Sequence, residues 1–182
     1  MRRALLTAAI IVGLGAVAGA AGFGQAPQHE HAEASPYAGH EASEVPSLTP
    51  AELQQLREGE GMGFARPAEL NHFPGPRHVL DLTAELGLTD EQRAASERIF
   101  AEMQTEARGL GARIIEAERH LNQRFAAGHI DEASLREATA TITELYGRLR
   151  FAHLHAHLRV TALLEPAQIE AYDRLRGYQG PA

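Results

Sequence analysis

Two long amphipathic segments joined by a short turn constrain the fold of this chain more than any other feature. In residues 90–127, apolar side chains recur every three or four positions: Ile99, Met103, Ala107, Leu110, Ile114, Ala117, Leu121 and Phe125. A second stripe follows residue 131 and contains Leu135, Ala138, Ile142, Leu145, Leu149, Ala152, Ala156, Val160 and Leu163. This spacing places each set on one face of an α-helix. Because short connections join antiparallel neighbours, the two segments predict a helical hairpin whose first arm is about 55 Å long.

Short motifs predict where the helices begin. Residues 48–52, Leu-Thr-Pro-Ala-Glu, place Thr at the N-cap, Pro at the first helical position and Glu where its carboxylate can reach back to the cap. Residues 88–92, Leu-Thr-Asp-Glu-Gln, repeat this pattern with Gln in the last position. Residues 164–168 keep it as well, except that Glu165 replaces Thr, which makes a poorer cap.

Weaker signals place the remaining elements. The glycines of residues 59–63 should end the first helix in a loop, and a short helix is expected over residues 78–86, closed by Gly87. No segment shows the alternation of a strand. The sequence therefore predicts an all-α fold, a long antiparallel helical hairpin with short flanking helices. The hairpin is too thin to bury both of its faces alone, so we also expect a homodimer.

Composition excludes several classes of chemistry. The 182 residues include no Cys, which rules out disulfides, thiolate catalysis, iron–sulfur clusters and Cys-type zinc sites. With 24 acidic residues against 17 basic ones, all of them Arg, the formal net charge is −7, and this disfavours nucleic acid as a partner. The size suits one folded domain with short extensions.

The N-terminal region indicates export. Two arginines precede an uncharged apolar stretch, so residues 1–26 are predicted to be a cleaved signal peptide and the protein to be periplasmic. An uncleaved membrane anchor is the alternative. Residues 27–47 lack an apolar period and predict a disordered linker, whose His and Glu side chains either stay solvated or hold a divalent ion loosely. The folded domain is expected over residues 48–178, followed by a tail of residues 179–182.

Two histidines in the second long helix are the strongest candidates for chemistry. His153 and His157 are four residues apart and share a helix face. Pairing the two arms through the turn sets them opposite Glu106 and Glu102, to within about one turn. Imidazole and carboxylate are ligands for Zn, Cu, Ni or Co, so these four residues predict a divalent metal site, with Met103 too deep in the core to be a ligand. The alternative is that the histidines are half-buried spacers that hydrogen-bond to the glutamates without metal.

Nothing in the sequence indicates catalysis. The few serines lie in no nucleophile-elbow setting. A zinc protease with a His-x-x-x-His pair needs Glu directly after the first His as general base, whereas Leu154 occupies that position here. The protein is therefore predicted not to be an enzyme.

The hairpin, the N-terminal signal and the Leu-Thr-x-x-Gln element of residues 88–92, echoed at residues 164–168, resemble the Spy/CpxP family of periplasmic chaperones. Related proteins are the ZraP- and CnrX-type heavy-metal resistance sensors. The resemblance covers residues 48–178 and implies a dimeric helical cradle that acts in envelope stress as chaperone, metal sensor or regulator. Sensor-type relatives place a ligand pair four apart near the end of the second long helix, as His153 and His157 are placed. Their His pair on the first helix has no counterpart here.

Two functions are compatible with these features. In the first, the protein binds a divalent metal ion as a sensor or resistance protein and signals to a membrane-bound partner by a change in shape. In the second, it is an ATP-independent chaperone without functional metal, which holds unfolded envelope proteins on a surface of arginine and apolar side chains. The candidates for that surface are Arg98, Arg108, Leu110, Arg113 and Ile114. A structural envelope protein with neither activity is a third possibility.

Overall fold

The computed structural model describes residues 35–41 and 43–178, and the chain divides into two units, Met1–Ala38 and Gly39–Ala182. In the first unit the described residues form a turn, in which the N–H of Ala38 donates to the carbonyl of Ser35 at 2.9 Å. The predicted signal peptide and C-terminal tail lie outside the described residues, as do residues 27–34 and 42 of the predicted linker. No described helix is both long enough and apolar enough to cross a bilayer.

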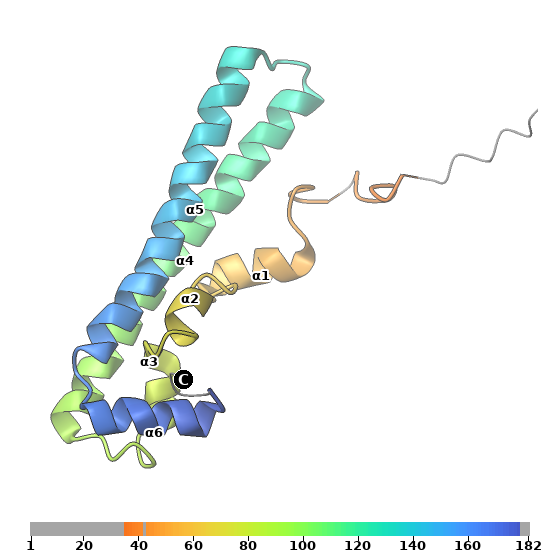
Figure 1. Ribbon diagram of the computed structural model, residues 1–182. Coiled ribbons are helices and arrows are strands. Elements are labelled where there is room, and N and C mark those ends of the chain that lie inside the picture. The colour runs from red at the N-terminus through yellow and green to blue at the C-terminus, as the bar shows by residue number, and fades with distance from the viewer. Residues whose placement is uncertain (1–34, 42, 179–182) are drawn as a thin grey trace, which may run out of the picture. The chain divides into compact units, whose positions relative to one another are not determined.

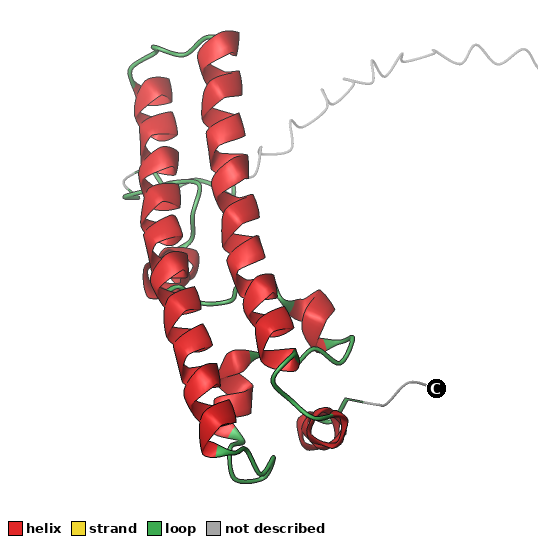
Figure 2. Ribbon diagram, turned by 90° about the vertical axis from the view of Figure 1, so that its left-hand side faces the viewer, coloured by secondary structure: helices red, strands yellow, loops and turns green. Residues whose placement is uncertain are grey.

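The second unit is built from helices, and residues 35–41 and 43–178 contain no strand (Figure 2). The helices are α1 Pro50–Glu58, α2 Arg66–Glu69, α3 Pro76–Asp81, α4 Asp90–Ala126, α5 Glu132–Thr161 and α6 Pro166–Arg176. α4 and α5 form the long antiparallel hairpin, and the short helices lie beside it, away from the turn that joins its arms (Figure 1). The predicted all-α hairpin with short flanking helices is confirmed.

The helices begin where the capping motifs predict. Thr49 caps α1, and the Glu52 carboxylate accepts the N–H of Thr49 at 2.8 Å. Thr89 caps α4 in the same way, with Gln92 as the reciprocal partner. Each box satisfies backbone N–H groups that have no partner within the helix, which is why a local sequence pattern can fix the start of a helix.

Two short helices differ from the prediction. The helix expected over residues 78–86 is α3, which ends at Asp81, and the chain continues in turns as far as Gly87. There the hydroxyl of Thr83 donates to the carbonyl of Leu80 at 2.7 Å, a local bond that competes with helical pairing. The single turn α2 was not predicted, since four residues are too few to show a period.

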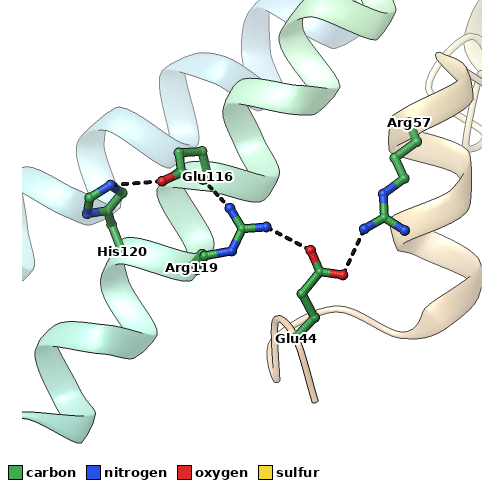
Figure 3. A network of polar contacts seen from close by, with 5 residues as sticks. All are labelled: Glu44, Arg57, Glu116, Arg119 and His120. Atoms are coloured by element: carbon green, nitrogen blue, oxygen red, sulfur yellow. Dashed lines mark hydrogen bonds and ion pairs between the residues drawn. The ribbon is translucent and has the colours of Figure 1, made fainter. Parts of the chain in front are cut away.

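The folded unit begins before residue 48, the boundary expected from the sequence. Val45 is fully buried, and the carboxylate of Glu44 bridges two arginines, Arg57 of α1 at 2.8 Å and Arg119 of α4 at 2.7 Å. Arg119 also pairs with Glu116 (Figure 3). The segment that enters α1 is therefore fixed to the hairpin by the buried side chains of Val45 and Leu48 and by an exposed ion-pair network.

Buried apolar side chains form two clusters along the hairpin. The first joins α1 and the segment before it to the hairpin, and it contains Val45, Leu48, Leu53, Leu56, Ala107, Leu110, Ile114, Ile115, Leu145 and Leu149. The second involves α3 and α6 and contains Val79, Leu86, Ile99, Ala156, Val160, Leu164 and Tyr172. Along α5, His153 lies between Leu149 of the first cluster and Ala156 of the second. The candidate histidines are thus placed where the two parts of the core meet.

Candidate functional site

A cavity of about 730 Å³ lies between the long hairpin and the segment that carries α2 and α3. Its wall includes His153 and His157 from α5, Met103 from α4, Glu69 from α2 and Met62 from the loop after α1. Met62 packs against the first core cluster and Met103 against the second. The cavity therefore collects imidazole, carboxylate and thioether groups from four separate segments of the chain.

His157 is held in a single tautomer. The residue is 6% exposed, and its Nδ1 lies 2.8 Å from the backbone carbonyl oxygen of Phe73. Because a carbonyl oxygen only accepts, Nδ1 carries the proton and donates, so Nε2 is the ring nitrogen that can offer a lone pair to a ligand. Fixing one ring nitrogen by a backbone carbonyl is the usual way in which proteins orient a histidine that binds a metal through its other nitrogen.

Glu69 lies beside this ring and is itself held in place. A Cβ atom added to Gly75 would come 2.7 Å from Oε1 of Glu69 and 3.1 Å from Nε2 of His157, so the two groups approach each other over the glycine. The other carboxylate oxygen accepts the hydroxyl of Tyr172 at 2.8 Å and that of Tyr178 at 3.1 Å. Burial, together with this carboxylate, raises the pKa of Tyr172 well above its ordinary value, so its hydroxyl remains a donor.

His153 is buried without a complete set of partners. The residue is 4% exposed, and its Nε2 has no hydrogen-bond partner among the described residues. Burial lowers its pKa, the neighbouring His157 lowers it further, and a backbone hydrogen bond to Glu60 acts in the opposite direction. His153 is therefore a neutral imidazole whose second nitrogen is unused. Such a group normally costs free energy of folding, so it calls for an explanation.

The loop that follows α2 is anchored to α6. His72 takes a left-handed backbone conformation with φ of 65°, and its Nδ1 lies 2.7 Å from Oδ2 of the buried Asp173. The next residue, Phe73, supplies the carbonyl that orients His157. Gly75 donates its N–H to the hydroxyl of Tyr172 at 3.4 Å. The C-terminal helix thus fixes both the loop and the carboxylate that border the histidines.

The structure brings together only part of the predicted metal site. His153 and His157 line one cavity, but Glu102 and Glu106 do not. Glu102 is exposed and pairs with Arg159 at 2.7 Å, and Glu106 is exposed on the same helix. The prediction paired residues at the same level along the two antiparallel helices, but this pairing does not determine the direction in which a side chain points. Both glutamates lie outside the cavity wall. Met103, expected to be too deep, is only half-buried and lines the cavity.

The prediction that Leu110 and Ile114 form part of a client-binding surface is wrong. Leu110 is 3% exposed and Ile114 is fully buried, because both belong to the core cluster that α1 covers. The arginines of that set, Arg98, Arg108 and Arg113, are exposed. Arg108 donates from Nε to the backbone carbonyl of Glu58 at 3.2 Å, at the end of α1.

The carboxylate that borders the histidines was missed in the sequence. Glu69 lies in a helix of one turn and shows no spacing relationship to the histidines, which follow more than 80 residues later. In residues 35–41 and 43–178, no group of three or more His, Asp or Glu side chains is gathered closely enough to hold a metal ion as placed. The histidine pair is therefore the part of the site that the structure assembles, with Glu69 at its edge.

The fold and the paired helix-start motifs define a small all-helical protein built on one long hairpin. Residues 76–176, more than half of the chain, match the LTXXQ motif family protein model, and the chain belongs to this family. The resemblance to the Spy/CpxP proteins is thereby confirmed, and family members are non-enzymatic chaperones or sensors, so this protein is not an enzyme. No curated protein and no solved structure matches the chain. The matched region contains His153 and His157 but not Glu69.

Proposed function

We propose that this protein is a periplasmic stress protein that binds a divalent transition metal ion in the cavity, as a heavy-metal sensor or resistance protein. The observation that carries the proposal is the pair of buried imidazoles on one cavity wall. Nδ1 of His157 is committed to a backbone carbonyl, and Nε2 of His153 has no partner among the described residues. Two imidazole nitrogens that line one cavity suit Zn, Cu, Ni or Co.

Glu69 supplies the third ligand in this proposal, in place of Glu102 and Glu106. Its Oε1 faces His157 across Gly75, and its Oε2 is held by two tyrosine hydroxyls. A carboxylate beside two imidazoles compensates the charge of a divalent ion, which a cavity lined by neutral groups alone would do poorly. An ion would complete the set by drawing these side chains together.

An ion bound in this cavity would link the hairpin to the short helices packed against it. His153 and His157 belong to the hairpin, whereas Glu69 belongs to α2. Its tyrosine partners are Tyr172 of α6 and Tyr178, two residues beyond the end of that helix. An ion that binds all three ligands stabilises the arrangement in which these segments are close, by mass action. This coupling supports a sensing role with a membrane-bound signalling protein as the partner. Family membership and the apolar N-terminal stretch support a periplasmic location.

Calorimetric titration of the protein with Zn²⁺, Cu²⁺, Ni²⁺ and Co²⁺ tests the proposal. We expect micromolar or tighter binding of at least one ion, and its loss in the variant His157→Ala. His155→Ala is the matched control, because His155 lies on the same helix but is exposed. Unchanged binding in His157→Ala, or no binding of any ion by the wild type, would contradict the proposal.

A second variant tests the site without removing a ligand. Gly75 has φ of −84°, which any residue adopts, so Gly75→Ala introduces no backbone strain. Its Cβ would come 2.7 Å from Oε1 of Glu69 and 2.8 Å from Cε1 of His157, and both groups must then move apart. We expect Gly75→Ala to bind the ion more weakly than wild type while remaining folded by circular dichroism.

Exposed apolar side chains on α5 favour a second candidate function, that of a chaperone. Phe151 is 63% exposed and Leu158 is 54% exposed. Phe151 stacks on the ring of His155 at 5.3 Å between centroids. Such a face can hold unfolded envelope proteins, or it can be covered in a homodimer. Suppression of aggregation that survives in His157→Ala but fails in Phe151→Ala/Leu158→Ala would support this function, and light scattering of the same variants would report the dimer.

A further inference from the structure

Both methionines of the described residues line the cavity that contains the histidine pair. Met62 comes from the loop between α1 and α2, and Met103 from the N-terminal half of α4. They are 41 positions apart in the sequence and pack against different core clusters. Two methionines from independent parts of the fold therefore line the same cavity as the two buried imidazoles.

The backbone at Met62 adds a second observation. Met62 has φ of 45°, in the left-handed region that side chains other than Gly rarely adopt, at a cost of about 1 kcal/mol or more. Its two sequence neighbours, at positions 61 and 63, are glycines, which adopt a left-handed conformation without steric strain. The fold nevertheless places a methionine at the strained position, and its side chain lines the cavity.

The two histidines can share an ion either with Met62 and Met103 or with Glu69, and these two ligand sets favour different metal ions. Thioether sulfur is a soft, neutral donor, which favours the cuprous ion and adds little to the binding of Zn²⁺. Two imidazoles and two thioethers carry no charge, and a monovalent ion in a buried neutral set carries a smaller desolvation penalty than a divalent one. The orphan Nε2 of His153 belongs to both ligand sets.

We infer that the cavity is a binding site for Cu⁺, with His153, His157, Met62 and Met103 as its ligands. This inference rests on the proposed function, because it uses the same histidine pair, and it specifies the ion that the cavity prefers. Glu69 assists divalent ions at one edge of the cavity, while the two sulfurs select copper in its reduced state. No electron transfer is involved, since the ion enters and leaves as Cu⁺.

The alternative explanation is that both methionines only fill space beside the core, as flexible apolar side chains often do. The variants Met62→Leu and Met103→Leu, singly and combined, separate the two explanations. Leu keeps nearly the same volume and removes the sulfur, so packing is preserved while the ligand is lost. His157→Ala serves as the control that removes a ligand common to both sets.

The test is an anaerobic titration of the full protein with Cu⁺ in competition with a coloured cuprous chelator, beside a calorimetric titration with Zn²⁺. We expect the Met62→Leu/Met103→Leu variant to bind Cu⁺ at least about tenfold more weakly than wild type and to bind Zn²⁺ unchanged. If the variant bound Cu⁺ as tightly as the wild type does, the inference would be wrong. It would also be wrong if the wild type bound Zn²⁺ but not Cu⁺, and in that second case the proposed function would still hold. A wild type that binds neither ion would overturn both.

X-ray absorption of the Cu⁺-loaded wild type gives a readout that does not depend on how any variant folds. We expect sulfur as well as nitrogen among the nearest neighbours of copper, and the sulfur contribution to be lost in Met62→Leu/Met103→Leu. A first shell of nitrogen and oxygen alone in the wild type would contradict the proposed ligands.

Discussion

The side chains of Gln92 and Gln168 hydrogen-bond to each other in both directions. Nε2 of Gln92 donates to Oε1 of Gln168 at 2.9 Å, and Nε2 of Gln168 donates to Oε1 of Gln92 at 3.0 Å. Each oxygen also accepts a helix-start N–H, that of Thr89 for Gln92 and that of Glu165 for Gln168. Two helix-start motifs that are distant in the sequence are therefore joined through their last residues, which explains why glutamine is better here than another capping residue.

This relationship predicts strong coupling between the two glutamines. Gln92→Ala and Gln168→Ala should each lower the free energy of unfolding by about 1–2 kcal/mol, because each leaves cap and partner groups unsatisfied. In the double variant the second substitution should cost less, with a coupling of about 0.5 kcal/mol or more. Urea denaturation of the four proteins measures the cycle. Additive losses would show that the two motifs act as independent caps.

The crossing of α1 and α4 depends on the absence of a side chain at Gly111. A Cβ there would overlap the carbonyl oxygen of Leu56, and it would lie 2.7 Å from the carbonyl carbon. Gly111→Ala should therefore displace α1 and lower the free energy of unfolding by about 2–3 kcal/mol. Gly109→Ala is the matched control, since nothing lies within 4 Å of its added Cβ, and it should gain up to about 1 kcal/mol from helix propensity. Thermal melts of both variants decide whether the crossing is as tight as described.

Adjacent residues before α1 should differ sharply in their contribution to stability. Val45 is fully buried, so Val45→Ala should lower the free energy of unfolding by about 1.5–3 kcal/mol. Glu44 pairs with Arg57 and Arg119 in an exposed network, and arginine pairing lowers the pKa of its carboxyl. Exposed ion pairs contribute little and are screened by salt, so Glu44→Gln should be close to wild type. A larger loss for Glu44→Gln than for Val45→Ala would show that charge, not burial, holds this segment.

Burial of His153 makes stability depend on pH. Its pKa in the folded protein lies below the usual value of 6.5, so the unfolded chain takes up the proton more readily. The stabilisation associated with the neutral ring is complete above pH 6.5 and is lost as the pH falls below it. Burial also lowers the pKa of His78, which acts in the same direction, so His153→Gln should reduce this acid sensitivity without abolishing it.

Chemical denaturation at pH 7.5 and pH 5.5 measures the effect of pH. His155→Gln, with an exposed ring on the same helix, should keep the pH dependence of the wild type. An equal dependence in wild type and His153→Gln would place the responsible group elsewhere. The causes that act on the pKa of His153 are its burial, the neighbouring His157 and a backbone hydrogen bond to Glu60, and the ring of Phe64 lies 6.5 Å from its own between centroids.

Local chemistry determined the elements that the sequence predicted correctly. Thr49 and Thr89 mark helix starts because an N-cap and its reciprocal partner lie only three residues apart. The apolar stripes of α4 and α5 predict the hairpin because a helix repeats every 3.6 residues. For the same reason His153 and His157 were expected to share a face, and both line one cavity.

Only the tertiary structure decided what surrounds that pair. Glu69 and Met62 reach the cavity because α2 and the loop before it pack against the hairpin, and no spacing in the sequence records that contact. The same packing buried Leu110 and Ile114, which were expected to be exposed, and it left Glu102 in an ion pair outside the cavity. Periodicity determines which side of a helix is apolar, but long-range packing determines which other segments cover that side. Long-range packing therefore also determines which side chains lie close enough to the histidine pair to bind an ion with it.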